Sequence, residues 1–431
     1  MCGALIALAN AGPDLPPLLV AGRSVVIYPH APAVFFRVRV AAGQLTHITV
    51  QQNDLDVVAS LRARPSDGVL ADADEFDYGT DSLSYVSETD AVVGLEIRLV
   101  AKHSATGSLT IDVETPRAPS PRDLLRREAE ILSTKVKSPP KDLSADAVIE
   151  VSRLATAAWR KVADPIGEAA SLVQTAGLFY GRGALDSAKQ LYLEALSLAG
   201  GKHDAANAAE AANDAGYCEL LAGDTGPSKV HLDEALDIWT KSKSRYGRAT
   251  ALNNIGLWNW RTGSFGAATR AYSEASRLFD PSDALNRGLV SNNLGLSYLS
   301  MGLYGRAIEA LSSALTLLPA SERIARGRAT INLGRAYLLN GDWRTAVRFY
   351  NRTVPLLQGS TVDTAHAKNN LGQAYAAGNL LPQAKKALQE ARALYSGEKS
   401  RGGEASADYH LAQIESRLGN VAAARSLLDD G

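Results

Sequence analysis

The fold is decided by SNNLGLSYLSMGLYGRAIEALSSALTLLP, residues 291–319. A small residue, Gly295, is followed seven positions later by Gly302, and then by Ala307, Leu311 and Ala314. Gly302 suits the left-handed position that ends a helix. Positions 307, 311 and 314 fall on one face of a second helix. The stretch therefore predicts two antiparallel helices that pack closely where the small residues meet.

This pattern occurs seven times between residues 170 and 431. The small first residues lie 38 to 40 positions apart and are Ala176, Gly216, Gly256, Gly295, Gly334, Gly372 and Ala412. The turn glycines that follow them are Gly183, Gly223, Gly263, Gly302, Gly341, Gly378 and Gly419. Ser228 replaces the first alanine of the second helix in one copy, and Thr353 interrupts the alanine face in another. A period this regular predicts a stack in which each helix pair buries its apolar face on its neighbours.

The repeated unit resembles the tetratricopeptide repeat, whose small–turn–Ala–aromatic–Ala signature the stretch quoted above matches, with Pro319 after it. The resemblance covers seven units, with a period of about 39 residues instead of 34, as in the longer-helix members typified by kinesin light chain. It implies a right-handed α-solenoid of about seven helix pairs over residues 165–431. It also implies a concave groove that binds a peptide or protein partner.

Residues 18–114 predict an antiparallel β-sandwich, because short β-branched segments such as 34–40, 47–50 and 95–99 alternate with turn signals. About eight strands are expected there. Residues 115–122, TPRAPSPR, contain three prolines and predict a linker. Residues 123–164 predict a helical lead-in, with one helix capped by Asp123 and running to about Lys135, and another from about Ser144 to Val162.

The segment from Leu18 to Arg122 resembles the β-rich leader that precedes tetratricopeptide arrays in bacterial proteins with a C-terminal CHAT domain, a caspase-like cysteine protease fold. The residues that carry this resemblance are Ala42-Gly43-Gln44, VQQNDLDVV at 50–58, Leu61, Thr115-Pro116-Arg117 and Pro121-Arg122-Asp123. It implies a sensor or regulatory role beside a caspase-like domain that follows this chain or is separately encoded. The catalytic His and Cys would then lie beyond residue 431, so no residue here inherits them.

Composition and motifs favour a non-catalytic protein. With 45 basic and 46 acidic residues, the net charge of -1 supplies no global field for nucleic acid. No apolar run of 18 residues exists, so no membrane span is expected. Cys2 and Cys218 are too few for a disulfide framework, and Cys218 is expected to pack inside a helix. The sequence contains no His-Glu-x-x-His, Gly-x-Ser-x-Gly or phosphate loop. We therefore expect neither enzymatic activity nor a cofactor or metal.

Three segments stay open. Residues 1–17 include CGALIALANA, which fits the remnant of a signal peptide, and hence export, or else a disordered or strand-like start. The loop 72–81 contains five carboxylates, which either bind calcium or, as we expect, are merely solvated. The final LLDDG either caps the array, precedes another domain or forms an interface.

A polar residue stands two positions before each small residue. The members of this ladder are Gln174, Asp214, Asn254, Asn293, Asn332, Asn370 and His410. In tetratricopeptide repeats this position faces the concave groove, where a carboxamide can hold a peptide backbone. The alternative is that these side chains cap or brace neighbouring helices.

We predict that an extended, partly acidic peptide lies along repeats three to six. Trp260 would be an apolar anchor, and Arg328 and Arg335 a cationic subsite. The other flanking positions expected to contact the peptide are Asn253, Leu257, Asn292, Leu296, His366, Asn369 and Gln373. A peptide-pheromone receptor is a third reading, but it would normally need an output domain such as a helix-turn-helix, and the sequence indicates none.

Overall fold

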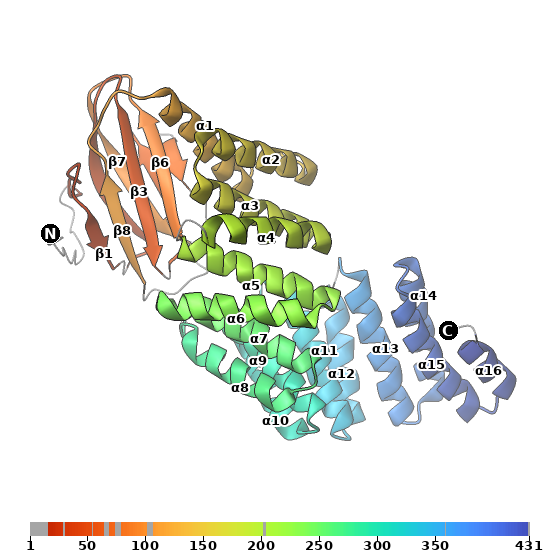
Figure 1. Cartoon of the computed structure of the whole chain (residues 1–431). Coiled ribbons are helices and arrows are strands. Elements are labelled where there is room, and N and C mark those ends of the chain that lie inside the picture. Colours follow the sequence, from red (N-terminus) through yellow and green to blue (C-terminus); the bar gives the residue numbers. More distant parts are fainter. Residues whose placement is uncertain are drawn as a thin grey trace. The chain divides into compact units, whose positions relative to one another are not determined.

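The computed structural model describes residues 16–28, 31–53, 55–63, 69–73, 79–100, 107–200, 204–357 and 359–429. An antiparallel β-sandwich precedes a solenoid of helix pairs (Figure 1). The chain forms two compact units. The first ends at Trp258 and also includes Arg277–Asp283, and the second comprises Asn259–Ser276 and the residues from Ala284 onwards. Each unit is described by itself.

Two four-stranded antiparallel sheets form the β-sandwich. One contains, in spatial order, β1 (Val25–Ile27), β8 (Ser108–Val113), β3 (Leu45–Asn53) and β6 (Gly79–Val86). The other contains β2 (Ala33–Val40), β7 (Ala91–Leu99), β4 (Val57–Arg62) and β5 (Val69–Ala73). Alternate side chains of a strand point to the same face, and Phe36, Val38 and Val40 of β2 are all buried in the core. The predicted sandwich is confirmed.

Helix α1 (Pro121–Lys137) covers polar residues on the outer face of the first sheet. The buried carboxylate of Glu130 accepts hydrogen bonds from Ser82 Oγ at 2.6 Å and from the Ser84 backbone N–H at 2.9 Å. His47 Nδ1 lies 3.0 Å from Ser84 Oγ. Burial raises the pKa of Glu130 and lowers the pKa of His47, because it disfavours the charged form of each. The side chains at these strand positions are polar, and their hydrogen bonds are made with helix α1 and not with solvent.

The N-cap of helix α1 is Ser120, three residues before Asp123, the cap that the sequence predicts. Ser120 forms a capping box with Asp123, so Pro121 occupies the first helical turn. Proline is favoured there because that turn does not use its missing N–H. The helix therefore takes in the end of the expected linker at residues 115–122. The next helix, α2 (Ala145–Val162), has Ser144 as its N-cap.

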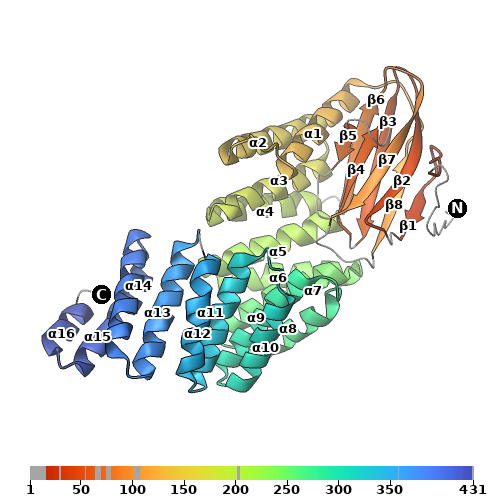
Figure 2. The same ribbon diagram turned by 180° about the vertical axis from the view of Figure 1, so that it is seen from behind.

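Seven further helix pairs follow within the described residues (Figure 2). They are α3 (Pro165–Gly181) with α4 (Leu185–Gly200), α5 (Ala205–Ala222) with α6 (Thr225–Lys241), α7 (Arg245–Arg261) with α8 (Phe265–Leu278), α9 (Ala284–Ser300) with α10 (Tyr304–Leu317), α11 (Arg323–Leu339) with α12 (Trp343–Thr353), α13 (Thr361–Ala377) with α14 (Leu381–Gly397), and α15 (Arg401–Arg417) with α16 (Val421–Asp429). A short 3-10 helix, Val354–Leu357, follows α12. The predicted repeat of helix pairs is confirmed.

The small residues allow the two helices of a pair to touch. A Cβ added to Gly295 would lie 2.5 Å from Leu311 Cγ, and one added to Gly334 would lie 2.7 Å from Tyr350 Cε1. Ser228, which replaces an alanine, is fully buried and donates to the backbone oxygen of Gly216 at 2.7 Å. The close contact that the sequence predicts is therefore present.

The turn glycines have positive φ, except for one. Gly183, Gly223, Gly263, Gly302, Gly341 and Gly419 lie between 73° and 96°. The prediction is wrong for Gly378, whose φ is -83°, because the next residue, Asn379, takes the left-handed conformation at 59°. Gly378 is needed for space: a Cβ there would lie 2.7 Å from Cδ2 of Trp343.

Candidate functional site

The odd-numbered helices of the second unit form one surface, which we call the inner face. Helix α9 packs on α11, α11 on α13, and α13 on α15, each more closely than successive even-numbered helices do. An array whose members approach more closely on one side curves toward that side. The predicted ladder residues Asn293, Asn332 and Asn370 belong to α9, α11 and α13, respectively.

Asparagine side chains link successive odd-numbered helices. In the second unit, Asn332 Nδ2 donates to Asn292 Oδ1 at 2.8 Å and so joins α11 to α9. In the first unit, Asn254 Nδ2 donates to Asn213 Oδ1 at 3.0 Å and joins α7 to α5. In both cases the acceptor stands three positions before a small residue and the donor two positions before the next one. We call each such bond an asparagine rung.

The rungs show that two of the ladder asparagines, Asn254 and Asn332, brace neighbouring helices. Asn254 is buried, while Asn293 and Asn332 are half-buried. Their predecessors bond along the helix: Asn253 Nδ2 donates to Asn254 Oδ1, and Asn292 Nδ2 to Asn293 Oδ1, each at 3.4 Å. The bracing interpretation thus has direct geometric support, and peptide contact by the same carboxamides stays a prediction.

The predicted apolar positions are only half-exposed. The indole N–H of Trp260 donates to Ser300 Oγ at 2.9 Å, and its ring is half-buried. Leu296 packs against the core cluster that contains Leu311. Leu257, in the first unit, is half-buried. Trp260, Leu296 and Leu257 would therefore each offer only part of their apolar side-chain surface to a ligand.

The two arginines of the predicted cationic subsite differ. Arg328 joins α11 to α13 through Asp363, with its Nε 3.1 Å from both carboxylate oxygens and its Nη2 3.0 Å from Oδ2. Burial opposes the ionisation of Asp363, but hydrogen bonds from Arg328 and Ser360 outweigh it and hold its pKa below the usual value. Arg335 is exposed and makes no ion pair with any residue that the structure describes. Of the two, Arg335 has its charge available to a ligand.

Three of the predicted residues meet in one pocket. His366, Asn369 and Asn370 of α13 line a cavity of about 240 Å³ together with Tyr395 of α14 and Ser406 of α15. Gly402 and Gly403 complete the lining. Gln373, also predicted, donates to Asn370 Oδ1 at 3.4 Å. The exposed His366 ring lies 5.5 Å from the Tyr395 ring, centroid to centroid.

Asn369 has an unsatisfied acceptor in this pocket. Its Nδ2 donates to Ser406 Oγ at 3.5 Å, and the residue is only 6% exposed. Its Oδ1 accepts no hydrogen bond from the described part of the chain. A buried acceptor without a donor is destabilising, and a group that donated to Asn369 Oδ1 would remove that cost.

The sequence pattern did not indicate the other members of the pocket. Tyr395 is the last-turn aromatic of α14, and Ser406 stands six positions before Ala412 in α15. The ladder identifies positions on the first helix of each repeat only. Gly403 is the one lining residue whose type could have indicated a contact, because a glycine inside a helix often marks close packing. A Cβ added to Gly403 would lie 2.3 Å from Tyr395 Cδ1, so the Tyr395 ring packs directly on this glycine.

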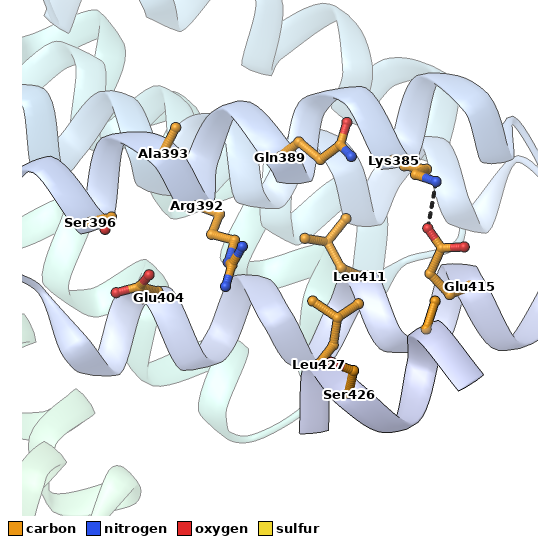
Figure 3. A pocket seen from close by; sticks show the side chains of 11 residues that line it. Lys385, Gln389, Arg392, Ala393, Ser396, Glu404, Leu411, Glu415, Ser426 and Leu427 are labelled. Carbon is orange, nitrogen blue, oxygen red and sulfur yellow. Dashed lines mark ion pairs between the residues drawn. The ribbon is translucent and has the colours of Figure 1, made fainter. Parts of the chain in front are cut away.

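A second cavity, of about 650 Å³, lies between α14, α15 and α16 (Figure 3). Leu411 and Leu427 contribute apolar surface, and the carboxylate of Glu415 lies 2.6 Å from Lys385 Nζ. Arg392 also lines the cavity and lies 2.6 Å from the buried carboxylate of Asp408. None of the predicted site residues lines it, and its two cations already have partners.

Three features of the described residues bear on the expectations from the sequence: the buried cysteine, the metal-ligating side chains and the apolar helices. Burial raises the pKa of Cys218 to about 11, because it disfavours the thiolate. No group of three or more metal-ligating side chains occurs among these residues. Nor is any helix in this part of the chain both long and apolar enough to cross a membrane. Residues 1–15, Cys2 among them, and the centre of the acidic loop, residues 74–78, lie outside the described ranges.

Comparisons with known proteins find a repeat family in part of the solenoid. A family model described as tetratricopeptide repeat matches residues 286–359, which correspond to α9 through α12. No curated protein matches the sequence. The resemblance of residues 18–122 to the leader of CHAT proteins stays a prediction.

Solved structures with a similar fold include the apo form of the quorum sensor NprR from B. thuringiensis. It has a TM-score of 0.59 and 13% identity, and the match covers 72% of this chain and 88% of that one. The apo form of RapI has a TM-score of 0.50 and 14% identity, over 61% of this chain and 95% of the other. A STAND protein with a tetratricopeptide repeat sensor from Pyrococcus horikoshii also has 0.50 and 14%, over 72% of this chain and 51% of that protein. These likenesses concern the fold alone.

Proposed function

We propose that this tetratricopeptide-type solenoid is a non-catalytic scaffold that holds an extended peptide segment of a partner protein on its inner face. The proposal is carried by one observation, the row of half-buried carboxamides on successive odd-numbered helices. Asn332 on α11 and Asn370 on α13 each use only one of their two polar groups inside the protein. Each retains a group for a ligand.

The remaining groups suit a peptide backbone. Within the described residues, Asn332 uses its Nδ2 on Asn292, which leaves its Oδ1 to accept from a peptide N–H. Asn370 accepts from Gln373, which leaves its Nδ2 to donate to a peptide carbonyl. Packed helices lie about 8–10 Å apart, and an extended peptide rises about 3.3 Å per residue. One carboxamide per repeat would therefore meet about every third residue of the peptide.

The charge of the inner face favours a peptide with acidic residues. Arg335 is exposed without an ionic partner among the described residues, and His366 is exposed one helix further along. Asp363, the nearby carboxylate, is neutralised by Arg328. Arg335 therefore contributes a positive charge that is not neutralised by a described residue, and its attraction to acidic residues of a peptide should weaken as salt increases.

The comparisons support a binding role of this kind. A tetratricopeptide repeat model matches residues 286–359, and the fold is similar to that of NprR, which is named as a quorum sensor. A second candidate is that the array is the sensor part of a larger assembly, such as the caspase-like system implied by the resemblance of residues 18–122. The STAND protein, whose tetratricopeptide array is named as its sensor, favours this candidate.

A random-peptide display library selected on the purified full chain would test the proposal. Fluorescence polarisation would then measure the affinity of the selected peptides for the wild type and for the double variant Asn332→Ala/Asn370→Ala, which removes the two carboxamides that retain a group for a ligand. We expect a loss of about tenfold or more, corresponding to about 1.4 kcal/mol, because two backbone contacts disappear. Raising the salt concentration should weaken the binding of acidic peptides further.

Asn213→Ala is the matched control, because Asn213 stands on α5 in repeat two and the variant breaks an equivalent rung while keeping the carboxamide of its partner Asn254. It should lower the melting temperature without changing peptide affinity. If the double variant retains affinity within about twofold of the wild type, the peptide does not lie along the ladder and the proposal fails.

A further inference from the structure

The buried asparagine of α13 occupies the same register as the acceptors of the two asparagine rungs. Asn213, Asn292 and Asn369 each stand three positions before a small residue. The first two accept from an asparagine of the next repeat, at 3.0 and 2.8 Å. For Asn369 the corresponding donor position is His410, whose Nδ1 instead lies 3.4 Å from Gln413 Oε1. The third rung is therefore open.

The open rung leaves a defined gap in hydrogen bonding. Asn369 is 6% exposed, and its Oδ1 receives no donor from the described residues. Ser406 Oγ accepts from Asn369 Nδ2 at 3.5 Å, so its own hydroxyl hydrogen can still be donated. The pocket thus presents an acceptor and a donor side by side, within a cavity of about 240 Å³.

The lining of the pocket is neutral. Neither a carboxylate nor a lysine or arginine contributes to it, and His366 is the single titratable group there besides the Tyr395 phenol, among the residues described. Burial raises the pKa of Tyr395 to about 12, so that phenol is uncharged. A buried ion without a partner is strongly disfavoured in such surroundings. A neutral group that both donates and accepts is favoured.

We infer that the pocket between α13, α14 and α15 binds a carboxamide, the side-chain group of glutamine or asparagine in the bound peptide. Its NH₂ donates to Asn369 Oδ1, as the asparagine of a closed rung would, and its oxygen accepts from Ser406 Oγ. The identity of the ligand as a peptide rests on the proposed function. The preference for a carboxamide over a carboxylate or an ammonium group rests on the pocket alone.

A free probe tests that preference without a partner protein. The full chain, labelled with ¹⁵N at asparagine, would be titrated with N-acetylglutamine methylamide while the side-chain NH₂ resonances are followed. The Asn369 pair, assigned by its disappearance in Asn369→Ala, should shift with saturation in the millimolar range. N-acetylglutamate methylamide, which has almost the same shape but a negative charge at neutral pH, should not shift it.

Two variants give the expected changes in binding. His410→Asn places an asparagine at the donor position, closes the rung and should raise the melting temperature while abolishing the response to the probe. Asn213→Ala, the matched control, removes the acceptor of a closed rung in the first unit and should leave the probe response unchanged.

The inference is overturned if the glutamine and glutamate probes shift the Asn369 resonances equally, if neither does, or if His410→Asn binds the probe as the wild type does. None of these outcomes affects the result of the peptide-display selection. A protein that binds peptides but has no carboxamide preference would therefore still be detected by that selection. Conversely, probe binding without selection of any peptide would retain the carboxamide site and refute the peptide-binding function.

Discussion

Gly295 has no side chain, and Leu311 of the partner helix fills the space where one would be. The same relation holds for Gly334 with Tyr350 and for Gly372 with Leu388, where an added Cβ would lie 2.5 to 2.7 Å from the nearest side-chain carbon. Glycine inside a helix is unfavourable by about 1 kcal/mol relative to alanine. Close packing of the two helices must outweigh that cost.

Gly295→Ala should therefore destabilise the second unit, although alanine is the better helix former. We expect a loss of about 1–3 kcal/mol, because a Cβ 2.5 Å from Leu311 Cγ forces the helices apart. Urea unfolding monitored by circular dichroism would measure it. Gly305→Ala is the control, since Gly305 is an exposed helical glycine of α10 with nothing within 4 Å of an added Cβ. It should be neutral or stabilising; equal losses in both variants would contradict the packing argument.

At the scale of elements, polar side chains determine how one helix is held against the next. Asn332 joins α11 to α9, and Arg328 joins α11 to α13 through the nearly buried Asp363. Glu130 does the same between α1 and β6. Each of these groups hydrogen-bonds across an interface, as buried polar groups must.

Asp363→Asn should make the second unit less sensitive to acid. The pKa of Asp363 is lower in the folded protein than in the unfolded chain, whose value is about 3.9. The carboxylate thus contributes stability above that value, and the contribution is lost as the pH falls through the folded-state pKa. The variant should be less stable at pH 7 by about 1 kcal/mol, since Arg328 is largely exposed.

Thermal melts of both proteins across the acid range would check this prediction. The two melting temperatures should converge as the pH falls below about 4. Arg328→Gln is a companion variant that removes the ion pair from the other side. A constant gap at every pH would show that the effect of Asp363→Asn comes from packing and not from charge.

For the whole molecule, the repeat architecture predicts that damage stays local. Each helix pair packs mainly on its sequence neighbours, so stability is roughly a sum over adjacent pairs. Gly372→Val would place a branched side chain where even a Cβ lies 2.5 Å from Leu388 Cγ. Hydrogen exchange should accelerate in α13 to α16 and stay unchanged in β1 to β8. Uniform acceleration throughout the chain would refute independent unfolding of the array.

Much of the fold could be predicted from local pattern. The spacing of Gly295, Gly302, Ala307 and Leu311 reflects contacts within one helix pair, and such contacts recur at fixed intervals in the chain. The strands were predictable because alternate residues such as Phe36 and Val38 enter the core. The exception, Gly378, looked like the other turn glycines, but its role depends on Trp343, which is distant in the sequence.

The candidate site could be predicted only in part. The ladder positions Asn332 and Asn370 lie on the first helices of their repeats, α11 and α13, since helical position follows from the period. It could not show that Arg328 is paired with Asp363, or that Tyr395 and Ser406 join His366 around a pocket. These contacts join different helices, and periodicity carries no information about which side chains then meet.

The sequence alone was enough to predict the helix pairs, because small residues and turn glycines recur in seven copies at a nearly constant spacing. Close packing inside a pair requires the same residue types at the same positions in each copy. Whether an asparagine rung is closed by a hydrogen bond or left open depends instead on the tertiary structure. Asn213, Asn292 and Asn369 look equivalent along the chain, yet two accept a hydrogen bond from the next repeat and the third does not. The reason is physical: a hydrogen bond requires a donor on the facing helix, and His410 turns to Gln413 instead.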